Sequence, residues 1–369
     1  MTLMNVIRGL IALLVCWTTA ALGLGLFGIR GGVLKSKEYY LPSPAFSDAA
    51  AVGSPNGLKG EHVLVDTRTG ALEPIRLKGD ERWGFLSVSP WRDREGRLLA
   101  AGRWVRPHRD DSEEPLWGLG VLRLPDATVI EHTPVDPLPT GRPCWLPDSP
   151  GVILFPAADG GLYRADVELS AAAGEAQGIS SEGWSNGRVG PSRVRLVSWS
   201  GKPAGESAIL VHDPVVSGDR RLRRLVFAAV ALPGKEGARK VFNPSRLWWL
   251  ELAEDGERIV AAEPLKAPGG QPLEPADTTE RFPNIAVQDG RIRLVYLARR
   301  PGDASGVLRE RELELDPETG RPRVKSVAQS LAAGGDALAF GPLLVAADGK
   351  SVFALDRSGK NARLRLGAR

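Results

Sequence analysis

The sequence predicts an all-β protein, a β-propeller of five or six four-stranded blades preceded by one N-terminal transmembrane helix. Three observations predict this fold. The 369 residues include 43 Gly and 29 Pro, which concentrate where chains turn. Short runs with strand character, joined by turns, recur along most of the chain. The amino terminus carries one uncharged apolar stretch, and the overall composition of 43% apolar and 25% charged residues is typical of a folded protein with a real core.

The apolar stretch covers residues 9–29, which contain no charged side chain and are bracketed by Arg8 and Arg30. About twenty apolar residues in a helix span the bilayer core. We therefore expect residues 1–30 to be a single-pass membrane anchor or signal sequence, with the following domain on the extracytoplasmic side. A cleaved signal peptide with a site near 19–21 and a buried core helix are the two alternatives.

Beyond the anchor, residues 31–60 are rich in Pro and Gly and are predicted to be a linker, and residues 61–369 are predicted to be the propeller domain. In this domain a β-rich run is followed six times by a turn and a second run, which predicts six hairpins. The six runs are 63–70, 120–124, 162–167, 247–252, 311–316 and 352–356.

Most of these hairpins follow another strand pair with a turn rich in Pro, Asp and Gly. The turn glycines are separated by 55, 67, 72 and 59 residues and are Gly96, Gly151, Gly218, Gly290 and Gly349. Units of four strands with a period of this size are typical of a propeller, and the uneven spacing indicates long inserted loops. The first unit shows only its outer hairpin, so the N-terminal strands could complete the final blade. A pair of β-sandwiches with long loops is the alternative fold.

Two segments carry a family resemblance: residues 144–155 and residues 282–296, with their Pro, Asp and Gly turns followed by an apolar run. They resemble the repeats of TolB-like propellers, whose units read roughly P-x-W-S-P-D-G-x-x-h-x-F. The resemblance extends over most of residues 61–366, although Gly96 lacks the preceding Asp. It implies a membrane-anchored, non-enzymatic propeller that binds a protein or peptide partner at its loop-rich face.

The sequence contains no G-x-S-x-G, H-E-x-x-H, Walker or paired C-x-x-C motif. Its G-x-G-x-x-G at residues 23–28 lies inside the apolar stretch, with no preceding strand, where a phosphate loop cannot work. We therefore predict no catalytic, cofactor-binding or metal-binding residues. The acidic segment 108–114 could contact a cation, but it lacks the spacing of a calcium loop and is better explained as a solvated loop. Subtracting the charges of Arg8 and Arg30 from the net +4 leaves +2, and no aromatic platform accompanies the basic runs, so nucleic-acid binding is not expected.

The alternative function is a carbohydrate-active, glycoside hydrolase-like propeller. Asp213 in the run His212-Asp213-Pro214 is a candidate for one of its carboxylates, although an Asp before Pro is also an ordinary turn start. Three carboxylates converging at the centre would favour this enzyme. Among the tryptophans, Trp145 and Trp248 are predicted to pack between blades at equivalent strand positions. Trp184 lies in a small-residue loop and is the candidate contact with a partner.

Overall fold

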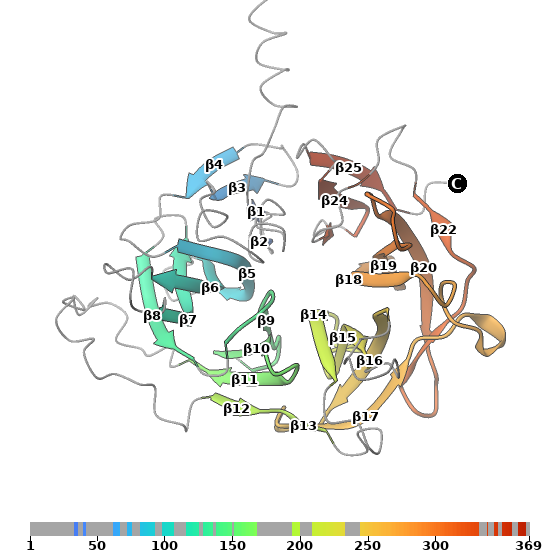
Figure 1. Cartoon of the computed structure of the whole chain (residues 1–369), viewed down its shortest axis with the longest axis horizontal. Helices are drawn as coiled ribbons and strands as arrows, with labels where there is room; N and C mark the ends of the chain where they lie inside the picture. Colours follow the sequence, from blue (N-terminus) through green and yellow to red (C-terminus); the bar gives the residue numbers. More distant parts are fainter. Residues whose placement is uncertain are drawn as a thin grey trace, which may run out of the picture.

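The computed structural model is a ring of sheets without any long helix among its described residues. The structure describes residues 33–35, 40–41, 62–66, 72–75, 82–92, 98–106, 116–124, 128–135, 138–149, 151–167, 194–199, 209–232, 244–331, 338, 343–345, 349–355 and 361–366. Their strands form six sheets. The sheets follow one another around a common centre in chain order (Figure 1). The predicted all-β propeller is therefore confirmed.

Four of the sheets are complete meanders of four consecutive antiparallel strands, in which the first strand lies nearest the centre and the last lies outermost (Figure 1). The first two contain β5 (Arg82–Arg92), β6 (Leu98–Arg106), β7 (Leu116–Leu124) and β8 (Thr128–Pro134), then β9 (Cys144–Trp145), β10 (Val152–Pro156), β11 (Leu162–Asp166) and β12 (Val194–Leu196). The next two contain β14 (Leu210–Val216), β15 (Leu225–Ala231), β16 (Arg246–Leu252) and β17 (Arg258–Pro264), then β18 (Thr279–Gln288), β19 (Arg291–Arg299), β20 (Val307–Leu315) and β21 (Pro322–Val324). Two short strands extend them, because β13 (Ser198–Trp199) pairs in parallel with β17 and β22 (Gln329–Ser330) pairs with β20.

The two remaining sheets come from the ends of the chain and meet at the same side of the ring (Figure 1). One contains β1 (Val33–Lys35), β2 (Tyr40–Leu41), β3 (His62–Asp66) and β4 (Leu72–Ile75), and the other contains β23 (Leu344–Val345), β24 (Ser351–Leu355) and β25 (Asn361–Arg365). Strand β1 runs parallel to β3, so β1 and β2 join the sheet of β3 and β4 and do not complete the sheet of β23–β25. Both β1 and β2 fall inside residues 31–60, the range predicted to be a linker.

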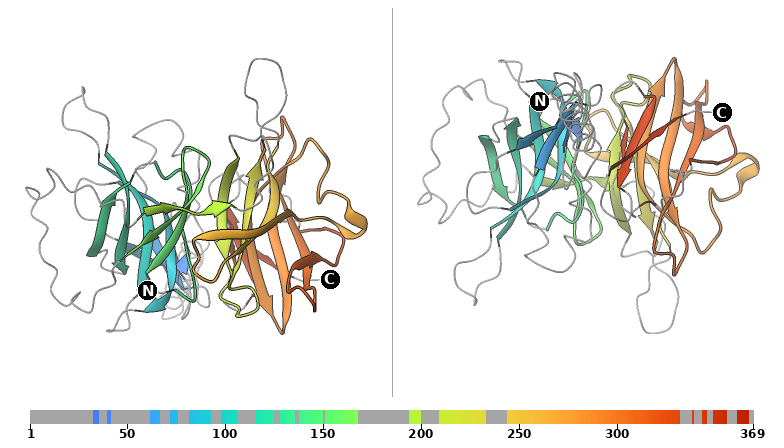
Figure 2. Two further views of the ribbon diagram at one scale, coloured as in Figure 1. Left: turned by 90° about the horizontal axis from the view of Figure 1, so that it is seen from below. Right: turned by 90° about the horizontal axis from the view of Figure 1, so that it is seen from above.

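The sheets of β9–β12, β14–β17 and β18–β21 pack both of their faces against neighbouring sheets, as the sheet of β14–β17 shows most clearly. All seven residues of β15 are buried, and successive side chains of a strand point to opposite faces. Phe227 packs in the core shared with the sheet of β18, and its neighbours Val226 and Ala228 pack in the core shared with the sheet of β9. A strand buried on both faces has a continuous apolar sequence instead of an alternating one. In the side views the yellow and orange strands run from one face of the ring to the other (Figure 2).

The predicted tryptophan packing is confirmed, but not the equivalence of the positions. Trp145 is 4% exposed on β9, and its indole N–H donates to the carbonyl of Ser87 at 2.9 Å. Trp248 lies on β16, the third strand of its sheet, and packs edge-to-face with Trp199 at a centroid distance of 5.9 Å. The two residues therefore stabilise different layers of their blades.

The predicted transmembrane helix at residues 9–29 lies outside the described residues. Within the described ranges, no helix has both the length and the apolar character that a membrane span requires.

Candidate functional site

Two of the strands nearest the centre carry the same backbone irregularity at the same height. Asp213 on β14 and Phe282 on β18 adopt positive φ angles of 50° and 55°, and each is followed by a proline. A β-bulge shifts the strand register at both points. Proline donates no hydrogen bond to the ladder and disfavours such a conformation in the residue before it. Non-glycine residues with positive φ cost about 1–3 kcal/mol each and cluster at functional sites.

The bulge on β14 turns the Asp213 carboxylate towards β18, where it forms a buried ion pair. Its Oδ2 accepts a hydrogen bond from Arg281 Nε at 2.7 Å and one from the backbone N–H of Phe282 at 3.2 Å. Its Oδ1 accepts a longer bond from Arg281 Nη2 at 3.4 Å. Burial opposes ionisation, but the Arg281 guanidinium and these bonds hold the pKa of Asp213 below its usual value. The site therefore contains a carboxylate that stays ionised although it is 7% exposed.

His212 stands beside this pair and is neutral at physiological pH. Burial and the nearby positive charge of Arg281 lower the pKa of His212 to about 4, against the opposing charge of Asp213. A neutral imidazole can donate one hydrogen bond and accept another. His212 therefore adds polarity to the site without adding charge.

A second arginine approaches Asp213 from the sheet of β9. Arg142 is 8% exposed and lies two residues before the innermost strand of that sheet. Burial lowers the pKa of Arg142, and the negative charge of Asp213 counteracts this effect, so the two groups are close enough to interact. Burial in turn raises the pKa of the Cys144 thiol to about 12, which keeps it protonated and unreactive.

The bonding of the two arginines differs. Arg281 is held in place by Asp213, as described above. Within the described ranges, Arg142 has neither a hydrogen-bond acceptor nor an ion-pair partner. Arginine remains protonated in proteins. Strands β9, β14 and β18 lie nearest the centre of the ring (Figure 1). The guanidinium of Arg142 interacts electrostatically with Asp213 on β14, so we group it with the same site.

Carboxylates are scarce on the innermost strands. Among the described residues of β2, β5, β9, β14, β18 and β23, only Asp213 and Glu280 carry one. Glu280 is occupied elsewhere, because it accepts from Arg246 at 2.9 Å and from the backbone N–H of Leu247 at 2.8 Å. The described part of these strands therefore does not bring three carboxylates together. Over the described ranges, no group of His, Cys, Asp and Glu side chains could hold a metal ion.

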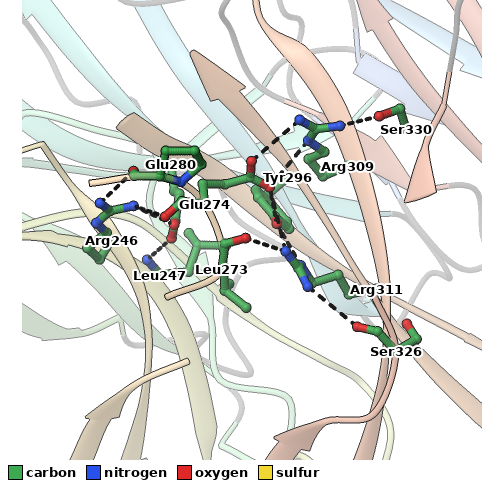
Figure 3. A network of polar contacts seen from close by, with 11 residues as sticks. Arg246, Leu247, Leu273, Glu274, Glu280, Tyr296, Arg309, Arg311, Ser326 and Ser330 are labelled. Atoms are coloured by element: carbon green, nitrogen blue, oxygen red, sulfur yellow. Dashed lines mark hydrogen bonds and ion pairs between the residues drawn. The ribbon is translucent and has the colours of Figure 1, made fainter. Parts of the chain in front are cut away.

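A second polar cluster lies between the sheet of β14–β17 and the sheet of β18–β21 (Figure 3). Tyr296 donates through its hydroxyl to Glu274 at 2.9 Å and accepts from Arg311 at 2.9 Å. Arg309 adds an ion pair to Glu274 at 3.2 Å. Burial raises the pKa of Tyr296 far above its usual value, so the phenol stays protonated. Because its charged groups contact one another, this network holds the two blades together.

The structure describes only one of the candidate residues that the sequence predicted, Asp213. Asp213 is at the centre and not in an ordinary turn, so the candidate carboxylate is in a position to act. Trp184 and the acidic segment 108–114 lie outside the described residues.

Sequence reasoning missed Arg142 and Arg281, the two cations of the site. One signal could have pointed to Arg281. A proline within a central strand indicates a bulge, and both Pro214 and Pro283 interrupt such strands. No comparable pattern marks Arg142, because its contact with Asp213 depends on the closure of the ring.

The comparisons with known proteins concern the fold. No protein-family profile matches the chain. No curated protein matches it either. Among solved structures, it is similar to an α-L-arabinanase of Penicillium chrysogenum in complex with arabinobiose, at 11% identity over 92% of this chain and 94% of that one, with a TM-score of 0.49. An endo-arabinase from Bacteroides thetaiotaomicron matches at 10% identity over 80% and 95% of the two chains, with a TM-score of 0.36. A glucose dehydrogenase matches at 14% identity over 93% and 99%, with a TM-score of 0.43.

These similarities correct the predicted function. The similar structures include arabinanases, a xylosidase, a family-43 glycoside hydrolase, glucose dehydrogenases and a prolyl endopeptidase. They do not support a TolB-like propeller, and the prediction of a non-enzymatic, protein-binding or peptide-binding propeller is wrong against this finding. At 14% identity or less they speak for the fold alone, so the residues of this chain have to carry the functional argument.

Proposed function

We propose that this chain is a carbohydrate-active propeller of the glycoside hydrolase type that binds a glycan at the centre of the ring. The observation that carries the proposal is Asp213, an ionised carboxylate in a strained conformation on an innermost strand. Strain of this kind persists only where the surrounding structure enforces it, and it gathers at functional sites.

The chemistry of the site suits a sugar. A carboxylate accepts hydrogen bonds from hydroxyl groups, and a neutral histidine both donates and accepts them. The ring of Phe282 lies 5.0 Å from the Arg281 guanidinium and packs in the core beneath the site.

In hydrolysis, Asp213 would act as the group that is already charged. Glycoside hydrolysis uses one ionised carboxylate as base or nucleophile and a second, protonated carboxyl as acid. The lowered pKa of Asp213 fits the first role. The acid would have to come from outside the described innermost strands.

The test combines binding and hydrolysis. The full chain is incubated with arabinan, xylan and arabinoxylan, and sugar release and oligosaccharide binding are measured. We expect wild type to bind one of these glycans and Asp213→Asn to lose about tenfold or more in affinity, since a hydrogen bond to a charged group contributes about 1.5–3 kcal/mol. Glu280→Gln is the matched control, because it changes a buried carboxylate that also pairs with an arginine between the same two sheets. A wild-type protein that neither binds nor cleaves any of the glycans would overturn the proposal.

We also propose that the ring has six blades, with the sheets of β1–β4 and β23–β25 as the two additional blades. The six sheets in chain order support this count. A crystal structure with any other number of sheets around the centre would contradict it.

Finally, we propose that residues 9–29 hold the chain at a membrane, with the domain on the extracytoplasmic side. The absence of charge over this stretch supports the proposal. Fractionation followed by protease treatment of intact cells tests it: a protein in the soluble fraction, or one protected from external protease, would contradict the proposal.

A further inference from the structure

Arg142 is a described group near the centre whose bonding the fold leaves unexplained. The residue is 8% exposed, and within the described ranges no hydrogen-bond acceptor or ion-pair partner contacts it. Charged side chains are almost never this buried without a partner, because removing an ion from water costs far more than packing returns. None of its nitrogens is among the fully buried, unbonded polar atoms of the described residues, so solvent or a ligand can reach the guanidinium and complete its bonding.

Asp213 does not fill that role. Its carboxylate is bonded to Arg281 Nε at 2.7 Å and to the N–H of Phe282 at 3.2 Å. Arg142 interacts with this charge through space but forms no bond to it. His212 is neutral and supplies no negative charge. The nearby Cys144 thiol is protonated and supplies none either.

We propose that the guanidinium of Arg142 binds the carboxylate of an acidic sugar, so that the glycan taken by the central site carries a uronic acid. This inference rests on the proposed glycan-binding function and specifies its substrate class. A guanidinium presents two parallel N–H donors that match the two oxygens of a carboxylate. Neutral sugars offer only hydroxyl groups, which leave the charge of Arg142 uncompensated.

Different side chains of the site would contact different parts of the ligand. Arg142 belongs to the sheet of β9, whereas Asp213 and Arg281 belong to the two following sheets. A sugar at the centre can therefore place its carboxylate on Arg142 and its hydroxyl groups on Asp213. Because Arg281 keeps Asp213 engaged, the two negative charges of ligand and protein are each matched to a separate arginine.

The test compares two probes that differ only in charge: a xylo-oligosaccharide that carries a glucuronic acid branch and the same oligosaccharide without it. Binding to the full chain is measured by calorimetry for wild type, Arg142→Gln and Arg142→Lys. Arg224→Gln is the control, since this arginine forms an exposed pair with Glu254. We expect wild type to bind the acidic probe about 10- to 100-fold more tightly, as charge-assisted hydrogen bonds predict. The ratio of the two affinities, acidic probe over neutral probe, should fall to about one in Arg142→Gln and stay at the wild-type value in the control. In Arg142→Lys it should take an intermediate value, because lysine keeps the positive charge but lacks the two parallel N–H donors of the guanidinium.

The outcomes separate the two proposals. If wild type binds both probes equally, the uronic acid inference is overturned and glycan binding stands. If wild type binds neither probe, both the uronic acid inference and the proposed glycan-binding function are overturned. A preference for the acidic probe that persists in Arg142→Gln would also overturn the inference. Thermal unfolding provides a second readout: the acidic probe should raise the Tm of wild type more than that of Arg142→Gln, and an equal rise would contradict the assignment.

Discussion

The neutral state of His212 predicts a specific dependence of stability on pH. The imidazole has a pKa of about 4 in the folded protein, against about 6.5 for an unperturbed histidine. Between these values the unfolded chain binds the proton and the folded chain does not, so the free energy of unfolding must fall as the pH is lowered from about 6.5 to about 4. At 1.36 kcal/mol per pKa unit the whole window corresponds to about 3 kcal/mol, and about 2 kcal/mol of it is lost by about pH 5.

The perturbation that isolates this effect is His212→Gln, which keeps a hydrogen-bonding side chain but cannot take up the proton. Urea unfolding followed by tryptophan fluorescence at about pH 7.5 and pH 5 gives the two free energies for each protein. We expect wild type to lose about 2 kcal/mol more than the variant between the two conditions. His132→Gln, on the outer strand β8, should keep the wild-type dependence. Equal losses in wild type and His212→Gln would refute the account of a buried, neutral histidine beside Arg281.

Two further predictions concern the packing between blades. Tyr296→Phe should destabilise the protein by about 2–3 kcal/mol, because it leaves two buried charged groups, Glu274 and Arg311, with one hydrogen-bond partner fewer each. Tyr163→Phe removes an exposed bond and should cost less than about 1 kcal/mol in chemical unfolding. Equal effects of the two substitutions would contradict the role of the network. Gly160→Ala should lower the Tm clearly more than Gly290→Ala. Both glycines have positive φ, but of these two only Gly160 is so close to a neighbouring segment that an added Cβ would clash with backbone, at the carbonyl oxygen of Ile209. A smaller effect at Gly160 would mean that the two sheets do not approach each other as described.

The sequence was sufficient to predict many of the hairpins, although not β1 and β2, which lie in the predicted linker. Hairpins such as β16–β17 follow from local patterns, because an apolar run, an Asp-Gly turn and a second run lie within about twenty residues of one another. The left-handed turn glycines Gly151, Gly290 and Gly349 were recognisable for the same local reason.

The centre of the ring was much harder to predict. Asp213 attracted attention through its neighbours in the sequence, but its partner Arg281 is 68 residues away and meets it only when two sheets pack side by side. Arg142 comes from a third sheet. Interactions between blades have no local signature, so the charge balance of the site becomes visible only in the folded ring.

The family resemblance misled in a related way. It rested on turns with Pro, Asp and Gly, which specify how a four-stranded blade is built. Such turns recur in propellers of different function, because function belongs to the site and not to the fold. The distinguishing residues were the prolines that interrupt β14 and β18, since the residues before them, Asp213 and Phe282, hold strained conformations that a following proline disfavours.

The central claim is that a glycan binds at the centre of the ring, and a crystal structure of the full chain with the glucuronic acid-substituted xylo-oligosaccharide tests it most directly. The account predicts sugar between β9, β14 and β18, with its carboxylate at about 2.7–2.9 Å from the Arg142 guanidinium and hydroxyl groups within hydrogen-bond distance of Asp213. A saturated crystal without sugar at the centre, or with the sugar bound only on the outer strands, would contradict it.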